Sequence, residues 1–476
     1  MKLSFLLLSA AFIFQSFPLL GEGAWSRFRG PNGSGVSQSG RLPTKFGPEE
    51  GVLWKTDLPP GHSSPVFSGD SIFLTGFGDD QVMTLALDRR TGTVRWKSET
   101  PKIHCGNLHE VNSPASPSPV TDGSNVYVFF QDVGLLSYDS EGRERWRVPL
   151  GPYNTPFGIA ASPVLAGSQI VQVCDGESGS FIVAVDKDTG RLSWRDERPG
   201  VRRGFSTPVL YQPEDDSGVQ VLVPGTNRLI AYEAQSGQKV WWVDGLTWQM
   251  KPTPVMDEDS IYVLGWAGGT NLSRKDANFQ QVLVLLDGDS DGRISKEEAD
   301  KGTDPKILKG WKDVEDLDGS GYFEERDWDL HQRKRTSVNS IQKILLGGKG
   351  NMTVQSAGWR YQKSLPNVPS PLLYQDVIYM VKDGAIVTSL DPSNGEVLKQ
   401  GRSKEAMSRY FASPVGGDGK VYLVSEAGEV SVLKAAPEWE VLQVNRMGEP
   451  CYSTPALVDG KIYLRTESAL YCFDQD

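Results

Sequence analysis

Short apolar stretches alternate with polar turns along most of the chain after residue 50. In one unit, the turn Ser68-Gly69-Asp70 leads into a strand-like run over residues 71–75, and a second alternating run comes after it. A period of two is typical of half-buried β-strands, and Gly and Asp accept the backbone angles of tight turns. The pattern therefore predicts an all-β protein built from short antiparallel strands.

A Ser-Pro or Thr-Pro pair, followed by an apolar residue and a strand-like run, recurs at eight places. The prolines of these pairs are Pro65, Pro119, Pro163, Pro208, Pro254, Pro371, Pro414 and Pro455. Their successive spacings are 54, 44, 45, 46, 117, 43 and 41 residues, so one unit is about 44 residues long. The spacing of 117 residues indicates an insertion of roughly 72 residues in the fifth unit.

A second motif, Asp-x-x-Thr-Gly-x-x-x-Trp, stands near the end of a unit. Copies occupy residues 88–96 and 186–194, and variants occupy residues 139–146 and 233–241. The motif supplies a tight turn between two strands, which makes each unit a four-stranded meander. A single sheet of this kind cannot bury its faces, whereas copies stacked around an axis can. We therefore predict an eight-bladed β-propeller of four-stranded antiparallel blades.

The two ends of the chain indicate how the ring closes. After Cys472 only four residues remain, too few for the fourth strand of the last unit, while residues 52–55 form an orphan strand at the start. We expect this N-terminal strand to complete blade eight, which also removes an open sheet edge.

The segment AlaLeuAspArgArgThrGlyThrValArgTrp, which ends at Trp96, resembles the blade signature of the pyrroloquinoline-quinone (PQQ)-like β-propeller repeat family. The resemblance covers roughly residues 50–476 apart from the insertion. The family includes cofactor-dependent alcohol dehydrogenases and non-catalytic scaffolds, among them the propeller lipoprotein of the outer-membrane assembly machine. The resemblance implies the fold and leaves the activity open.

A tryptophan recurs at the same position in six of the eight units, where it could either stack on a quinone or wedge neighbouring blades together, and Lys399 takes this position in unit six. We favour the wedge, because a ring that recurs at one position of the repeat serves the packing between blades. These residues are Trp54, Trp96, Trp146, Trp194, Trp241 and Trp359.

The N-terminus is predicted to be a signal peptide. One Lys precedes an apolar run from Phe5 to Leu20, and the small residues Gly21 and Gly23 follow it, which is typical of a secretory leader cleaved near residue 23. The apolar run is short for a membrane span, so we expect a secreted or periplasmic protein without a transmembrane segment. Four scattered cysteines do not form a disulfide framework, and a net charge of −11 argues against a nucleic-acid partner.

The insertion is strongly acidic and contains two candidate calcium loops. Residues 287–330 carry 15 Asp and Glu against 7 Lys and Arg. Residues 287–298 match the EF-hand loop, in which oxygens at fixed positions surround Ca²⁺ and a glycine allows the sharp turn. The predicted ligands of the first loop are Asp287, Asp289, Asp291, the Arg293 carbonyl, Ser295 and Glu298.

The second candidate loop, residues 316–327, departs from the motif at its last position. Asp327 replaces the usual Glu, and its shorter side chain reaches the ion less easily, so we predict weaker Ca²⁺ binding there. The predicted ligands are Asp316, Asp318, Ser320, the Tyr322 carbonyl and Asp327. Because Ca²⁺ is abundant outside the cytoplasm, we interpret both sites as structural staples, with helices near residues 278–286, 295–301, 305–314 and 325–335.

The resulting division of the chain is a signal peptide (1–23), an N-terminal extension (24–50), blades one to five in part (51–272), an EF-hand pair insert (273–337), and the rest of blade five with blades six to eight (338–476). The residues just before each Ser/Thr-Pro pair are expected to surround one mouth of the ring and to hold a protein or small-molecule ligand. They are His62, Asn112, Arg203, Lys251, Asn367, Arg409 and Tyr410. Polar lining is also what a wet channel needs without a ligand.

The sequence offers little support for catalysis. It contains no adjacent cysteines, no GxSxG and no HExxH, and its calcium loops lie outside the propeller, so no catalytic residue is assigned. The segment His104 to Glu110 could alternatively ligate a metal through His104 and His109. We favour a non-catalytic, calcium-binding scaffold. The alternatives are a PQQ-dependent dehydrogenase and a carbohydrate-directed enzyme or lectin-like binder.

Overall fold

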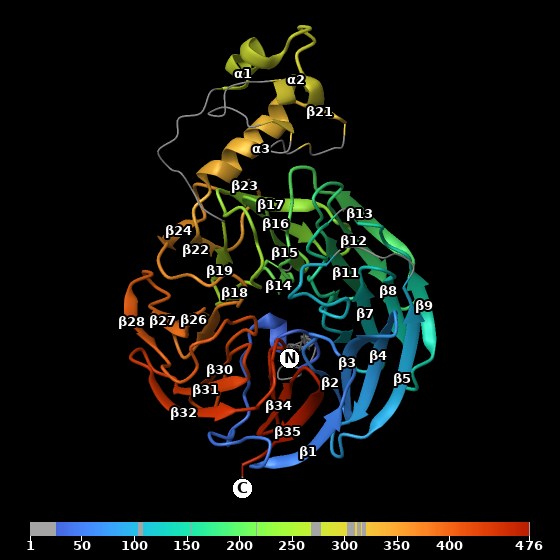
Figure 1. Cartoon of the computed structure of the whole chain (residues 1–476), viewed down its shortest axis with the longest axis vertical. Coiled ribbons are helices and arrows are strands. Elements are labelled where there is room, and N and C mark those ends of the chain that lie inside the picture. The colour runs from blue at the N-terminus through green and yellow to red at the C-terminus, as the bar shows by residue number, and fades with distance from the viewer. Residues whose placement is uncertain are drawn as a thin grey trace, which may run out of the picture.

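The computed structural model describes residues 25–102, 108–153, 155–215, 217–267, 278–301, 310–311, 316 and 320–475. Eight sheets stand around a central axis, and a small helical module projects from one side of the ring (Figure 1). This confirms the predicted eight-bladed propeller of four-stranded antiparallel blades.

Blades one to four follow one another along the first half of the chain, each a simple meander. Blade one is β2 (Val66–Ser68), β3 (Ser71–Gly78), β4 (Gln81–Asp88) and β5 (Val94–Pro101); blade two is β6 (Val120–Thr121), β7 (Val126–Phe130), β8 (Gly134–Tyr138) and β9 (Glu144–Val148). Blade three is β10 (Val164–Ala166), β11 (Gln169–Cys174), β12 (Phe181–Asp186) and β13 (Leu192–Glu197); blade four is β14 (Val209–Tyr211), β15 (Gln220–Gly225), β16 (Arg228–Glu233) and β17 (Lys239–Asp244), with β23 (Gly350–Asn351) added in parallel outside β17.

Blade five is interrupted by the insertion, and the later blades are again regular. Blade five is β18 (Val255–Met256), β19 (Ser260–Gly265), β22 (Ser340–Leu345) and β24 (Ala357–Tyr361); blade six is β25 (Leu372–Tyr374), β26 (Val377–Lys382), β27 (Ile386–Leu390) and β28 (Val397–Arg402). Blade seven is β29 (Val415–Gly417), β30 (Lys420–Val424), β31 (Glu429–Lys434) and β32 (Glu440–Arg446); blade eight is β33 (Ala456–Val458), β34 (Lys461–Arg465), β35 (Ala469–Phe473) and β1 (Val52–Asp57).

The N-terminal strand closes the ring as predicted. β1 pairs antiparallel with β35, with Lys55 opposite Tyr471 and Asp57 opposite Ala469. In Figure 1 the blue strand β1 lies beside the red strand β35 at the outer edge of blade eight. The first and last strands of the propeller therefore share one sheet.

The Ser/Thr-Pro pairs form a belt of hydrogen bonds around the axis. The backbone N–H of one Ser or Thr donates to the side-chain hydroxyl of its counterpart in the next blade, at 2.9–3.1 Å. The bonded pairs are Ser64 to Ser118, Ser118 to Ser162, Ser162 to Thr207, Thr253 to Ser370, Ser370 to Ser413, Ser413 to Thr454, and Thr454 back to Ser64. Each of these seven hydroxyls satisfies a buried backbone donor, so among the described residues the repeated residue links neighbouring blades at seven of the eight junctions, all except that between blades four and five.

The tryptophan at the outer strand of a blade packs on the Asp-x-x-Thr-Gly turn of the next blade. Trp194 donates its indole N–H to the Ala234 carbonyl at 2.9 Å, and its ring covers Gly237. Trp54, Trp96, Trp146 and Trp359 make the same two contacts on the turns containing Gly92, Gly142, Gly190 and Gly395. Trp241 differs, because it donates to Gln220 of its own blade while β23 pairs with its strand.

The N-terminal extension runs across the ring, which the sequence did not predict. The Trp25 carbonyl accepts from Phe67 in blade one, Arg27 donates to the Pro208 carbonyl in blade four, and Arg29 donates to the Pro371 carbonyl in blade six. Val36 bridges to Gly416 in blade seven. The extension includes one 3-10 turn, η1 (Pro31–Gly33), and it joins blades that are far apart in sequence.

The insertion forms a helical module with its own small core. Its elements are α1 (Phe279–Leu286), β20 (Ile294–Ser295), α2 (Lys296–Lys301), β21 (Tyr322–Phe323) and α3 (Glu325–Thr336). Ile294 pairs with Phe323 in a short antiparallel ladder, and both side chains are buried. The expected helix over residues 305–314 falls almost entirely outside the described residues. Within the described part of the chain, the helices are too short or too polar to cross a membrane.

Candidate functional site

A cavity of about 440 Å³ lies on the axis of the ring, and all eight blades contribute to its wall. We call it the axial cavity. Its lining includes seven of the belt residues, and Phe28 of the N-terminal extension also lines it. The cavity therefore depends on ring closure and on the extension together.

The residue two positions before each belt Ser or Thr lines this cavity. An extended chain points alternate side chains in the same direction, so positions separated by two share the axial face. These residues are His62, Ser116, Ala160, Phe205, Lys251, Val368, Phe411 and Tyr452. The spacing from the Pro motif is the signal that would have located them from the sequence.

Aromatic rings form much of the wall. The His62 ring stacks on Tyr452 with centroids 4.3 Å apart, and Phe157 meets Phe205 edge to face at 6.2 Å. Phe411 lies near Tyr452, with ring centroids 5.7 Å apart. Such surfaces favour a ligand with an apolar or aromatic body.

The charged groups around the cavity are mostly neutralised by partners. Arg409 binds Glu426 through two contacts of 2.6 Å, and Arg203 binds Glu177 at 2.5 Å. Lys251 instead donates to the amide oxygen of Asn367 at 2.6 Å. Burial, assisted by the nearby charge of Arg203, lowers the pKa of Lys251 to about 8.

Five of the seven predicted rim residues line the axial cavity: His62, Asn112, Lys251, Asn367 and Arg409. Arg203 is not one of the lining residues, and its guanidinium lies over the ring of Phe157, 5.1 Å from the ring centroid. Tyr410 does not belong to the rim. Its side chain is 2% exposed and its hydroxyl donates to the Ala406 carbonyl, because Arg409 and Phe411 take the cavity side and Tyr410 points the other way.

The His104 to Glu110 segment contributes one ring to the cavity. His109 lines it and stacks on Phe157 with centroids 5.9 Å apart. His104 and Cys105 lie outside the described residues. In the described part of this segment, the His109 ring is thus held at the cavity wall by its stacking on Phe157.

The first acidic loop brings three carboxylates together. Oxygens of Asp287, Asp289 and Asp291 all lie within 4.8 Å of one another. Glu298 returns to the start of the loop, where its carboxylate accepts from the Gly288 N–H at 2.7 Å and from Ser295 at 2.8 Å. Arg293 forms an ion pair with Asp291 at 3.2 Å. This oxygen-rich arrangement fits a hard cation such as Ca²⁺.

The second acidic loop is described only in part. Asp316 accepts from the N–H groups of Ser320 and Gly321, at 3.1 and 2.9 Å. Tyr322 lies on the short ladder opposite Ser295, while Asp318 lies outside the described residues. Asp327 is fully buried and accepts from the Glu324 N–H at 3.0 Å, which caps the start of α3. Asp327 thus caps α3 in this structure, and its role as a Ca²⁺ ligand stays a prediction.

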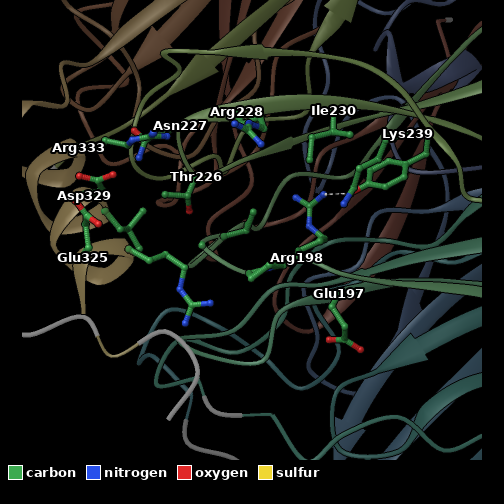
Figure 2. A pocket seen from close by; sticks show the side chains of 16 residues that line it. Glu197, Arg198, Thr226, Asn227, Arg228, Ile230, Lys239, Glu325, Asp329 and Arg333 are labelled. Carbon is green, nitrogen blue, oxygen red and sulfur yellow. Dashed lines mark hydrogen bonds between the residues drawn. The ribbon is translucent and has the colours of Figure 1, made fainter. Parts of the chain in front are cut away.

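A groove of about 490 Å³ separates α3 from blades three and four (Figure 2). Arg198 on its propeller side is paired with the fully buried Asp175 at 2.9 Å. Leu330 of α3, which lines the groove, packs in one cluster with Trp248 and Ala267. The insert is therefore seated on the propeller by apolar contact, with charged side chains around it.

A family model described as "Outer membrane protein assembly factor BamB" matches residues 47–181 and 177–476. Together these ranges cover the whole propeller. The chain belongs to this family. Its repeats are thus PQQ-like, as the blade signature indicated.

Individual relatives match over shorter stretches. BamB of Francisella salina is 25% identical over 194 residues, which are 39% of this chain and 33% of that protein. BamB of Nitrosomonas eutropha is 28% identical over 130 residues, 27% of this chain and 28% of that protein. The matched regions span about a third or less of the curated relatives' length.

Solved structures share the fold at low identity. BamB from Moraxella catarrhalis aligns with a TM-score of 0.55 at 11% identity, over 89% of this chain and 99% of that one. Quinohemoprotein alcohol dehydrogenase from Comamonas testosteroni aligns with a TM-score of 0.60 at 11% identity, over 95% and 81%. The BamB structure and the dehydrogenase structure are therefore about equally similar to this chain in fold.

Proposed function

We propose that this chain is an extracytoplasmic, non-catalytic binding or assembly scaffold that holds its ligand in the axial cavity. The observation that carries the proposal is the cavity itself, whose wall takes one or more residues from every blade and from the N-terminal extension. Aromatic walls and a few polar groups are typical of a binding site. The relatives named as outer membrane protein assembly factors support a role in the cell envelope, and the predicted leader over residues 1–23 agrees with that location.

The residues of the cavity do not fit the quinone dehydrogenases that the sequence resemblance suggested as an alternative. Those enzymes combine the quinone with calcium on propeller loops and with adjacent cysteines. Among the described residues, Asp383 is the one carboxylate that lines the axial cavity. Cys174, Cys451 and Cys472 are buried free thiols, and none of them lines it. We therefore assign no redox step to this site.

The test is to block the cavity and follow what the protein binds. Ala160 lines the cavity, so Ala160→Trp should fill part of it, whereas Val354→Trp adds the same ring at a position that is 82% exposed. Native mass spectrometry of the mature chain purified from its own envelope should show bound species in the wild type and Val354→Trp only. Species retained by Ala160→Trp, or alcohol-dependent dye reduction after adding PQQ and Ca²⁺, would contradict the proposal.

We also propose that the two acidic loops bind Ca²⁺ and staple the insert, the second more weakly. Carboxylates held this close repel one another, so the ion should stabilise the module. Calorimetry should show a lower melting temperature in EDTA, and Asp287→Asn should remove most of that difference. Asp70→Asn, on an exposed propeller turn, is the matched control. A melting curve that EDTA leaves unchanged would rule out the staple.

A further inference from the structure

Lys251 places a primary amine in the wall of an aromatic cavity without a counter-ion. Its Nζ is held by the Asn367 amide oxygen at 2.6 Å, and the side chain is partly buried. Among the described residues no carboxylate forms an ion pair with it. An ammonium ion in such surroundings loses hydration without gaining a charged partner, which favours the neutral amine.

The charged group that acts on the amine is a cation, and the carboxylates near the cavity are held by other partners. Arg203 lies close enough for its charge to disfavour a second cation, and Glu177 is already paired with Arg203. Asp383 accepts from the Tyr410 N–H at 2.9 Å. The remaining titratable groups that line the cavity are His62, His109, Arg409 and Tyr452. A buried lysine near another cation is a common way to make an amine nucleophilic.

We propose that Lys251 is a nucleophile that captures aldehydes carrying an aromatic group as a reversible imine. The inference rests on the proposed ligand role of the axial cavity and deepens it. The amine supplies the covalent contact, while Phe157, Phe205 and Phe411 receive the aromatic body. Asn367 positions the amine at the wall.

The reaction balances without a further reagent. The lone pair of the neutral Nζ attacks the carbonyl carbon, and the carbonyl π electrons move to oxygen. One proton passes from nitrogen to that oxygen through water, which gives a carbinolamine. The hydroxyl then takes up a second proton and leaves as water, while the nitrogen lone pair forms the C=N bond and the nitrogen releases its remaining proton. Amine and aldehyde become imine and water, with no change in oxidation state.

The experiment traps this imine on the full mature chain. The protein is incubated with benzaldehyde and sodium cyanoborohydride at pH 7.5, and the modified lysines are quantified by peptide mass spectrometry. With a pKa of about 8 in place of about 10.4, the neutral fraction of Lys251 is larger by roughly 200-fold. Since a lower pKa also weakens the nucleophile, we expect labelling at least ~10-fold faster than at the exposed Lys363. Equal or slower labelling of Lys251 would overturn the inference.

A charge variant tests whether the missing counter-ion makes Lys251 reactive. Asn367→Asp places a carboxylate where the amide oxygen now lies, so it should keep Lys251 protonated and slow its labelling at least ~10-fold at pH 7.5. Labelling should recover as the pH approaches 10. Labelling that is unchanged at pH 7.5 in the folded variant would contradict the proposed role of the missing counter-ion.

A non-reactive probe separates this inference from the proposed function. Benzyl alcohol has the same ring and cannot form an imine, and its binding can be followed by NMR with the wild type and with Ala160→Trp. Saturable binding lost in Ala160→Trp, without trapping at Lys251, would keep the binding cavity and reject the nucleophile. If the wild type shows neither saturable benzyl alcohol binding nor trapping at Lys251, both the binding cavity and the nucleophile would be contradicted.

Discussion

At the residue scale, one hydroxyl per blade explains the most regular feature of the sequence. The Pro of each Ser/Thr-Pro pair marks the repeat, but the residue before it makes the contact with the next blade, at seven of the eight junctions. The sequence predicted where all eight pairs lie. It did not predict their mutual hydrogen bonds, because a bond between residues about 44 positions apart follows from the curvature of the ring.

Ser162→Ala should destabilise the ring. The Ser162 hydroxyl accepts from the buried Ser118 N–H at 2.9 Å, and its loss leaves that donor unsatisfied, at a cost of about 1–3 kcal/mol. Urea unfolding should show the loss as a lower midpoint. Ser124→Ala, at an exposed turn, should leave the midpoint nearly unchanged. Equal urea midpoints for Ser162→Ala and Ser124→Ala would show that this hydrogen bond between blades does not stabilise the ring.

His62 should make stability depend on pH. Burial, and then the charge of Arg465, lower the pKa of His62 to about 4. Because an unfolded His has a pKa of about 6.5, the unfolded chain binds this proton first as the pH falls. The contribution of His62 is intact above pH 6.5 and is lost progressively towards pH 4, by about 3 kcal/mol.

Urea unfolding of the wild type and His62→Gln between pH 7 and pH 4.5 tests this shift. The variant lacks the titrating ring, so its stability should fall less than that of the wild type over the same interval. Parallel pH profiles would show that His62 does not titrate as described.

At the element scale, the repeated turn of one blade and the tryptophan of the preceding blade pack against each other, and we call this contact the joint between two blades. The glycine of each Thr-Gly turn has a positive φ and lies against the indole of the preceding blade, so a side chain there would meet the ring. Blade six lacks the tryptophan, and Lys399 stands there instead. Its ammonium lies 4.7 Å from the ring centroid of Trp439, so blade seven supplies the aromatic surface. The sequence predicted the regular joints and not this exchange.

Gly237→Ala should weaken the joint between blades three and four. Its added Cβ would lie 2.4 Å from a ring atom of Trp194, and its φ is +72°. Gly69→Ala has a similar φ of +52° with nothing within 4 Å, so it controls for backbone strain. Gly237→Ala should therefore lose about 1–3 kcal/mol more than Gly69→Ala in urea unfolding. A loss of stability no larger than that of Gly69→Ala would contradict the proposed packing of Trp194 on Gly237.

At the scale of the whole molecule, closure depends on two segments before the first blade. The sequence predicted β1, because a lone strand at one end matched a missing strand at the other. It did not predict the extension that carries Arg27, Phe28 and Arg29, because a segment without periodicity gives no sign of what it contacts. The fold was therefore predictable from its repeats, whereas the contribution of Phe28 to the axial cavity comes from a non-repeating segment.

The most direct test of ring closure is hydrogen–deuterium exchange on the full chain, measured at β1 and β34. If β1 is the fourth strand of blade eight, those of its amides that face β35 should exchange as slowly as the amides of β34, and only with unfolding of the ring, whereas its outward-facing amides lie on the sheet edge and exchange fast. β35-facing amides of β1 that exchange orders of magnitude faster than those of β34 would show that the ring is open between β1 and β35, and would contradict the account.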